Sequence, residues 1–168
     1  VDELRDAFGR ADALSDKIKR FIHERNATII SEETPVRLEP GAKLICHFIP
    51  FSFTDSSTAV DFRERSEMIQ MMCSPSKMLF FLNGNYNFEG FCAYSTMTNG
   101  VSGAYTQLFR NGMIEAVYVI ESKNGMIYPD IIENKVLTFA DAYLPLLRDL
   151  GMSPPIAVSI TILGAKGY

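Results

Sequence analysis

Apolar residues recur at three- and four-residue spacing near the start of the chain, which is typical of an amphipathic helix. This pattern predicts a helix over 13–30. Its apolar side carries Leu14, Ile18, Phe21, Ile22 and Ile29. Lys17, Arg20 and Arg25 make the same segment locally basic, which indicates either a solvated helix face or contacts with a nucleic acid or a partner.

A second helical pattern covers residues 130–150. We expect Asp130 to cap this helix and Glu133 to complete a capping box, because the two residues have the spacing of that motif. The buried stripe is expected to comprise Ile132, Val136, Phe139, Tyr143, Leu147 and Leu150. Pro145 lies inside the pattern and predicts a kink or a separate last turn, since proline removes a helical hydrogen bond.

Between the two helices the pattern changes to short apolar runs, which predict a sheet within 42–128. The run LICHFIPF reads as a strand buried on both faces. Asn-Gly then occurs at 83–84, 99–100, 111–112 and 124–125, and this dipeptide favours tight hairpin turns. The expected β-meander has strands near 78–82, 87–96, 103–110, 113–121 and 126–128.

The hairpin around Asn111-Gly112 gives a specific register. A two-residue turn there would pair Phe109 with Ile114 and place both in the core. Arg110 and Glu115 would then share the solvent face as a diagonal pair. This interpretation gives the hairpin a structural role and leaves the two charges without a function.

Two further elements complete the expected fold. Asp61 and Glu64 have capping-box spacing and predict a short helix, with Phe62, Ile69 and Met72 facing inward. The nearly unbroken apolar run at 156–163 predicts a C-terminal strand, which we place centrally in the sheet. The expected class is α+β: an antiparallel β-meander with Asn-Gly hairpins and a central C-terminal strand, packed with two longer helices.

Chain length and net charge further restrict the expected number of domains and the expected partners. A chain of 168 residues is expected to form a single α+β domain. No apolar run is long enough to span a membrane, so we expect no membrane partner. The chain begins at Val1 and shows no secretory signal, which indicates an excised fragment of a longer protein. The odd number of widely spaced cysteines predicts a cytoplasmic location. The net charge of -4 argues against a surface devoted to nucleic acid.

The chemistry-bearing residues form no recognised motif. Cys46, Cys73 and Cys92 are widely spaced in apolar runs, which predicts buried, reduced thiols and no metal or other cofactor. No phosphate-binding glycine loop or nucleophile elbow occurs, so no residue is assigned a catalytic role. His47, inside an apolar strand, is expected to be a hydrogen-bonded core residue. A hydrolase using His47 or His23 remains an alternative.

Four segments carry a family resemblance: RFIHERNATIISEETPVRLEPGAKLICHFIPFSF, YNFEGFCAYS, YTQLFRNGMIEAV and LGMSPPIAVSITILGAKGY. Together they resemble the C-terminal region of bacterial proteins with an N-terminal AlbA/Schlafen-type putative DNA-binding domain. In that family the nucleic-acid and nucleotide-binding assignments belong to the N-terminal domain, so no site residue is carried over. Residues 51–80 match less clearly.

The resemblance implies a non-catalytic companion domain with a role in interaction, dimerisation or ligand sensing, within a transcriptional-regulator protein. The expected partners are the parent's DNA-binding domain, nucleic acid through the parent, and a second copy in a homodimer. The alternatives are direct nucleic-acid binding through Lys17, Arg20 and Arg25, and a hydrolase of unknown substrate.

Overall fold

The computed structural model describes residues 2–55, 59–65, 67, 69, 83–95, 100–122 and 125–167, with side chains from residue 11 onward. The chain forms two units, Val1–Thr34 and Pro35–Tyr168. The first unit consists mainly of helix α1, which spans Asp2–Ile30. The helix expected over 13–30 is therefore confirmed, and it begins about three turns earlier than its apolar stripe.

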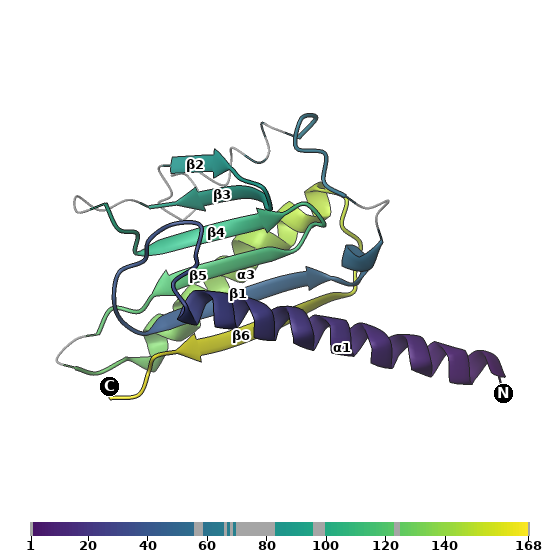
Figure 1. Ribbon diagram of the computed structural model, residues 1–168, viewed down its shortest axis with the longest axis horizontal. Coiled ribbons are helices and arrows are strands. Elements are labelled where there is room, and N and C mark those ends of the chain that lie inside the picture. The colour runs from purple at the N-terminus through teal and green to yellow at the C-terminus, as the bar shows by residue number, and fades with distance from the viewer. Residues whose placement is uncertain are drawn as a thin grey trace. The chain divides into compact units, whose positions relative to one another are not determined.

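The second unit is built on a six-stranded antiparallel sheet with the order β2-β3-β4-β5-β1-β6 (Figure 1). Its strands are β1 (Lys43–Pro50), β2 (Asn83–Tyr86), β3 (Gly90–Tyr94), β4 (Ala104–Phe109), β5 (Ile114–Val119) and β6 (Ile156–Leu163). A 3-10 turn, η1 (Phe51–Thr54), follows β1. Helix α3 (Pro129–Asp149) lies across one face of the sheet, which confirms the α+β class.

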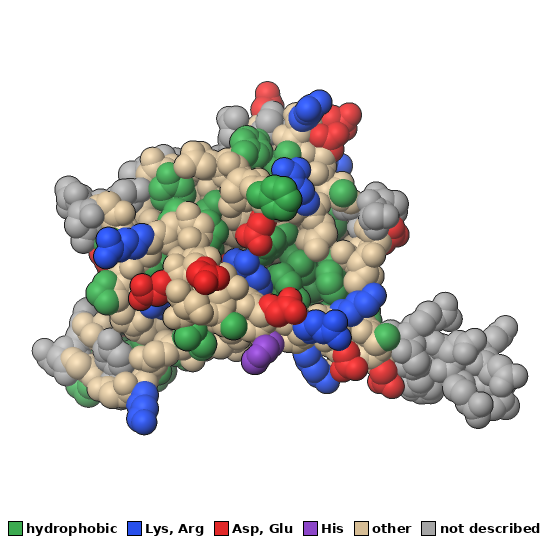
Figure 2. Space-filling view, in the orientation of Figure 1, with side chains coloured by type: hydrophobic (Ala, Val, Ile, Leu, Met, Phe, Trp, Pro, Cys, Tyr) green, Lys and Arg blue, Asp and Glu red, His purple; other side chains and the backbone are tan. Residues whose placement is uncertain are grey.

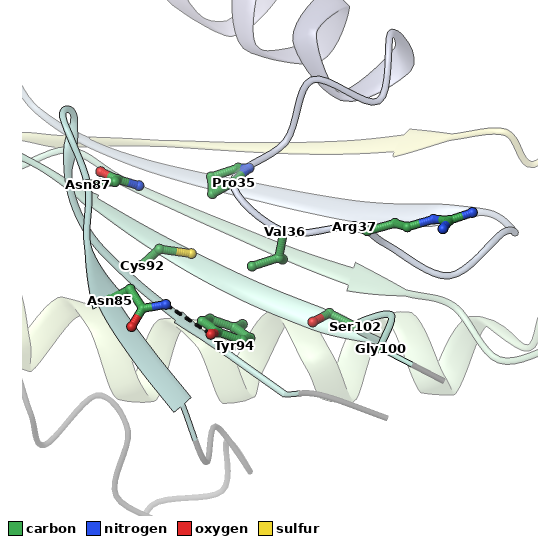
Figure 3. A pocket seen from close by; sticks show the side chains of 9 residues that line it. All are labelled: Pro35, Val36, Arg37, Asn85, Asn87, Cys92, Tyr94, Gly100 and Ser102. Atoms are coloured by element: carbon green, nitrogen blue, oxygen red, sulfur yellow. Dashed lines mark hydrogen bonds between the residues drawn. The ribbon is translucent and has the colours of Figure 1, made fainter. Parts of the chain in front are cut away.

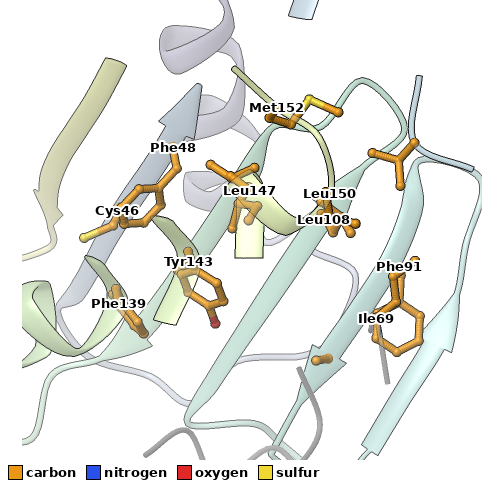
Figure 4. Close-up of a cluster of buried hydrophobic side chains, with 14 of the residues drawn as sticks. Cys46, Phe48, Ile69, Phe91, Leu108, Phe139, Tyr143, Leu147, Leu150 and Met152 are labelled. Carbon is orange, nitrogen blue, oxygen red and sulfur yellow. The ribbon is translucent and has the colours of Figure 1, made fainter. Parts of the chain in front are cut away.

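The hydrophobic core lies between α3 and that face (Figure 4). Strands β1, β3, β4 and β5 contribute alternate residues, among them Phe48, Phe91, Leu108 and Ile114. From α3 the core takes Phe139, Tyr143 and Leu147, as the helical stripe predicted. Burial raises the pKa of the core thiol Cys46 to about 12.

The two described cysteines, Cys46 and Cys92, are buried free thiols, as expected. Cys73 lies outside the described residues.

The C-terminal strand has the predicted bounds but not the predicted position. β6 pairs with β1 and stands at the end of the strand order, so its expected central place is wrong. An unbroken apolar run is typical of a strand that is buried on both faces. In β6 the apolar residues Val158, Ile160 and Ile162 are instead exposed.

The β4–β5 hairpin has a different register from the expected one. The Phe109 N–H donates to Met113 O (2.9 Å) and the Gly112 N–H donates to Phe109 O (3.0 Å), which closes a three-residue loop. Gly112 has a φ of 82°, as the last position of such a loop requires. The pairing is therefore Leu108 with Ile114.

This one-residue difference reverses the β4 side chains relative to those of β5, so Leu108 rather than Phe109 joins Ile114 in the core under α3. Glu115 pairs with Gln107 and is fully buried, so the expected solvent-side pair of Arg110 and Glu115 is wrong. Arg110 remains exposed. Its Nε donates to Phe88 O (3.0 Å), and its guanidinium carbon lies 5.6 Å from the centre of the Phe62 ring.

The remaining Asn-Gly positions have mixed outcomes. Asn83-Gly84 lies inside β2, and the β2–β3 turn forms instead between Asn87 and Gly90, whose backbone groups exchange two hydrogen bonds. Asn99 and Asn124 lie outside the described residues, as does the strand expected at 78–82. No named strand covers 126–128.

Helix α3 starts differently from the prediction. Tyr128 occupies the N-cap position without a side-chain cap, and Pro129 begins the helix. The expected capping box at Asp130 is therefore wrong, because proline's fixed φ already suits the first helical position. Asp130 lies in the first turn, where its charge favours the helix dipole. The helix continues through Pro145 to Asp149.

Near Asp61 the capping prediction is confirmed in part. Asp61 Oδ1 accepts hydrogen bonds from the N–H groups of Arg63 (2.8 Å) and Glu64 (3.2 Å), which lowers the pKa of Asp61. Ile69 is fully buried in the core, and the partly buried Phe62 packs against this core. Met72 lies outside the described residues.

Candidate ligand-binding site

A row of six paired polar or thiol-bearing residues crosses the whole sheet on the face away from α3. We call it the polar row, and from β2 to β6 it comprises Asn85, Cys92, Gln107, Glu115, His47 and Ser159. Residues directly opposite each other in antiparallel strands share a face. Their sequence neighbours, such as Cys46 and Ile114, lie in the core under α3, so the polar row lies on the other face.

Glu115 is at the centre of the row. Its Oε1 accepts a hydrogen bond from the Tyr105 hydroxyl (2.7 Å), and its Oε2 lies 3.2 Å from His47 Nε2. All three side chains belong to fully buried residues. A carboxylate only accepts hydrogen bonds, so with Glu115 ionised, His47 Nε2 carries the hydrogen. The network supplies the partners that a buried carboxylate needs.

On the β4 side the row continues through a pair of side-chain amides. Asn87 Nδ2 donates to Gln107 Oε1 (2.7 Å), and Gln107 Nε2 lies 3.3 Å from Asn87 Oδ1. Asn87 Oδ1 also accepts from the Gly90 N–H (2.8 Å). These bonds fix Asn87, at the β2–β3 turn, against the buried row.

Next to this amide pair is a cavity with a volume of about 360 Å³ (Figure 3). Its lining comprises Pro35, Val36, Arg37, Asn85, Asn87, Cys92, Tyr94, Gly100 and Ser102. The loop over the cavity is held by backbone bonds: the Ser102 N–H donates to Arg37 O (2.8 Å), and the Glu39 N–H donates to Ser102 O (3.0 Å). The cavity is thus formed by β2, β3 and two loops distant in sequence.

The walls of the cavity are polar but mostly uncharged. Asn85 Nδ2 donates to the Tyr94 hydroxyl (3.0 Å), which leaves that hydroxyl able to donate its own hydrogen (Figure 3). Pro35 and Val36 add an apolar surface. Arg37 lines the cavity but extends away from Asn85 and Tyr94, so its charge lies at the rim.

The residues singled out from the sequence lie elsewhere. Lys17 and Arg20 are exposed on α1, whereas Arg25 is only 9% exposed, so it is a poor surface contact. His47 is a hydrogen-bonded core residue, as predicted, and His23 is exposed. None of these five residues lines the cavity.

Sequence reasoning missed Asn85, Asn87, Tyr94 and Ser102. One signal was present: NGNYN places Asn83, Asn85 and Asn87 at alternating positions, which share a face on a strand. Within the part of the chain that the structure describes, no three His, Cys, Asp or Glu side chains are grouped to hold a metal ion. No protein-family model, curated protein or solved structure matches this chain.

Proposed function

We propose that this chain is a non-catalytic, ligand-sensing domain whose cavity binds a small, uncharged, hydrogen-bonding molecule. The observation that carries the proposal is the 360 Å³ cavity walled by Asn85, Tyr94 and Ser102 and lying beside the buried centre of the polar row. Cavities of roughly 300–1,000 Å³ with a few placed polar groups are typical of small-molecule sites.

The walls indicate the chemistry of the ligand. Asn85 carries an amide that can donate and accept, Tyr94 carries a hydroxyl on a flat ring, and Pro35 adds an apolar surface. Neutral compounds with neighbouring donors and acceptors, such as nucleobases, primary amides and sugars, have matching groups. The Asn87 amide is already bound to Gln107 and the Gly90 N–H, so it supports the wall.

The family resemblance supports placing this domain beside a DNA-binding domain in a cytoplasmic transcriptional regulator. In that setting, ligand binding to this domain would regulate the parent's DNA-binding domain. Two buried free thiols agree with a reducing compartment. No helix in the described part of the chain is both long and apolar enough to cross a membrane.

A hydrolase is less favoured because of where the titratable groups lie. His47 and Glu115 do converge, but both are fully buried and neither lines the cavity. A general base must come within hydrogen-bond reach of the reacting group, either directly or through one water. In this fold His47 and Glu115 form a hydrogen bond with each other inside the sheet.

One observation supports direct nucleic-acid binding: Lys17 and Arg20 are exposed on α1. Against it, the chain has a net charge of -4. Figure 2 shows acidic and basic side chains interspersed on the face in view, whereas duplex DNA favours a surface of one sign. Submicromolar binding of duplex DNA, lost in a Lys17→Ala, Arg20→Ala double variant, would favour this alternative.

The proposal is tested by thermal melting of the whole chain with a panel of nucleobases, nucleosides, primary amides and monosaccharides. We expect at least one compound to raise the Tm by several degrees near saturation. Tyr94→Phe removes one hydroxyl and should weaken that compound's binding about tenfold. Phe88→Ala, at a 96% exposed position outside the cavity, is the matched control and should leave binding unchanged.

The proposal is wrong if no compound in the panel shifts the Tm. It is equally wrong if Tyr94→Phe binds the active compound as tightly as the unaltered chain does.

A further inference from the structure

Strand β6 is an edge strand without the usual protection. It pairs with β1 on one side, and among the described residues no strand pairs with its other side. Soluble proteins normally guard such edges with charged residues, proline or a bulge. Residues 150–165 contain no charged residue, and no proline lies within Ile156–Leu163.

The same strand presents apolar side chains to solvent. Val158 is 49% exposed, Ile160 is 53% exposed and Ile162 is 40% exposed. Their partners on β1 are Phe48, Cys46 and Leu44, all of which lie in the core beneath α3. The apolar face of the sheet therefore continues past the helix onto β6, where the described structure leaves it open.

Helix α3 extends this surface. It packs against β1, and Lys135 Nζ on one of its sides lies 4.4 Å from the centre of the Tyr118 ring of β5. Leu137 and Leu144 lie on the opposite side of the helix from Lys135, and we infer that this side is the one nearer β6, because β5 and β6 flank β1. Both leucines are exposed.

These five residues form what we call the β6 strip: Leu137, Leu144, Val158, Ile160 and Ile162. We propose that the β6 strip is a homodimer interface, in which a second copy pairs its own β6 antiparallel to this one. A two-fold axis at Ile160 would bring the two Ile160 side chains together and set Val158 opposite the partner's Ile162. The two sheets would then join into one, with an α3 from each copy on the same face.

A second copy is favoured over an unrelated partner for two reasons. The strip is self-complementary about a two-fold axis, and isologous contacts of this kind close into dimers. Each copy has a net charge of -4, and the uncharged β6 edge lets two copies meet without bringing like charges into direct contact.

The area of the β6 strip is also consistent with a dimer interface. Five half-exposed apolar side chains amount to a few hundred Å² per copy, comparable to the largest patches on monomers, which are often functional. Two strips and two strand edges together approach the roughly 1,000 Å² that a specific interface requires.

The test is sedimentation velocity of the whole chain between about 1 and 100 μM, a range that detects dimers with micromolar dissociation constants. We expect a dimer that Ile160→Lys weakens at least tenfold, since a charge would face its own copy. Phe88→Lys is the matched control, because Phe88 is also exposed but lies outside the strip, and it should remain dimeric. Circular dichroism checks that both variants fold.

Register is tested by oxidation of an Ile160→Cys variant that also carries Cys46→Ala, because Cys46 pairs with position 160 on β1 and could form an intrachain disulfide. This variant should give a disulfide-linked dimer, whereas Phe88→Cys in the same Cys46→Ala background should not. A monomeric chain at 100 μM would overturn the proposal, and so would an Ile160→Lys variant that dimerises normally. These results do not depend on the cavity or its ligand.

Discussion

Glu115 is the fully buried acidic residue at the centre of the polar row. Its carboxyl group is fully buried between Tyr105 and His47: Oε1 accepts a hydrogen bond from the Tyr105 hydroxyl (2.7 Å), and Oε2 lies 3.2 Å from His47 Nε2. Removing the carboxylate would leave two buried polar side chains without their partner. Arg110, five residues earlier, is exposed, and its side chain contacts Phe88 O and the Phe62 ring.

We therefore expect Glu115→Ala to lower the free energy of unfolding by about 2–5 kcal/mol, since each of the two buried polar groups that loses a hydrogen bond costs about 1–3 kcal/mol. Arg110→Ala should lower it by less than about 1 kcal/mol, since exposed charges contribute little. Denaturant melts of both variants measure the difference. Equal losses in the two variants would mean that Glu115 does not occupy the buried position described here.

At the scale of elements, the sequence located the strands better than it paired them. Asn-Gly correctly marked the β4–β5 turn, but two- and three-residue loops both use this dipeptide, and only loop length sets the register. The choice of loop decided whether Phe109 or Leu108 would lie opposite Ile114 in the core. Asn83-Gly84 gave no turn at all, because the tight turn formed at Asn87–Gly90 instead.

The β2–β3 turn gives a prediction at this scale. Gly90 has a φ of 153°, and a Cβ there would lie 2.1 Å from Leu108 O, a backbone atom that cannot move aside. Gly100 has a φ of 78°, with nothing within 4 Å of an added Cβ. Gly90→Ala should therefore cost at least about 2 kcal/mol more in unfolding free energy than Gly100→Ala. Similar losses from the two changes would show that β3 and β4 do not approach this closely.

At the scale of the whole molecule, the α+β class, both long helices and the C-terminal strand followed from periodicity. The cavity did not, because its walls come from residues 35–37, 85–94 and 100–102, which only the sheet pairing brings together. The edge position of β6 was also hidden, since an exposed apolar run and a doubly buried run have the same pattern. The spacing of apolar residues predicts which side of a single helix or strand is buried. It does not predict which helices and strands become neighbours.

The central claim is that the cavity beside the polar row binds a neutral, hydrogen-bonding molecule. Its most direct test is an NMR titration of the ¹⁵N-labelled chain with the same panel of nucleobases, nucleosides, amides and sugars. We predict saturable shifts of the Asn85 side-chain amide and of the Cys92 and Ser102 backbone amides, all at the cavity wall. Shifts that are absent for every compound, or that are confined to the exposed basic residues Lys17 and Arg20 of α1, would contradict the claim.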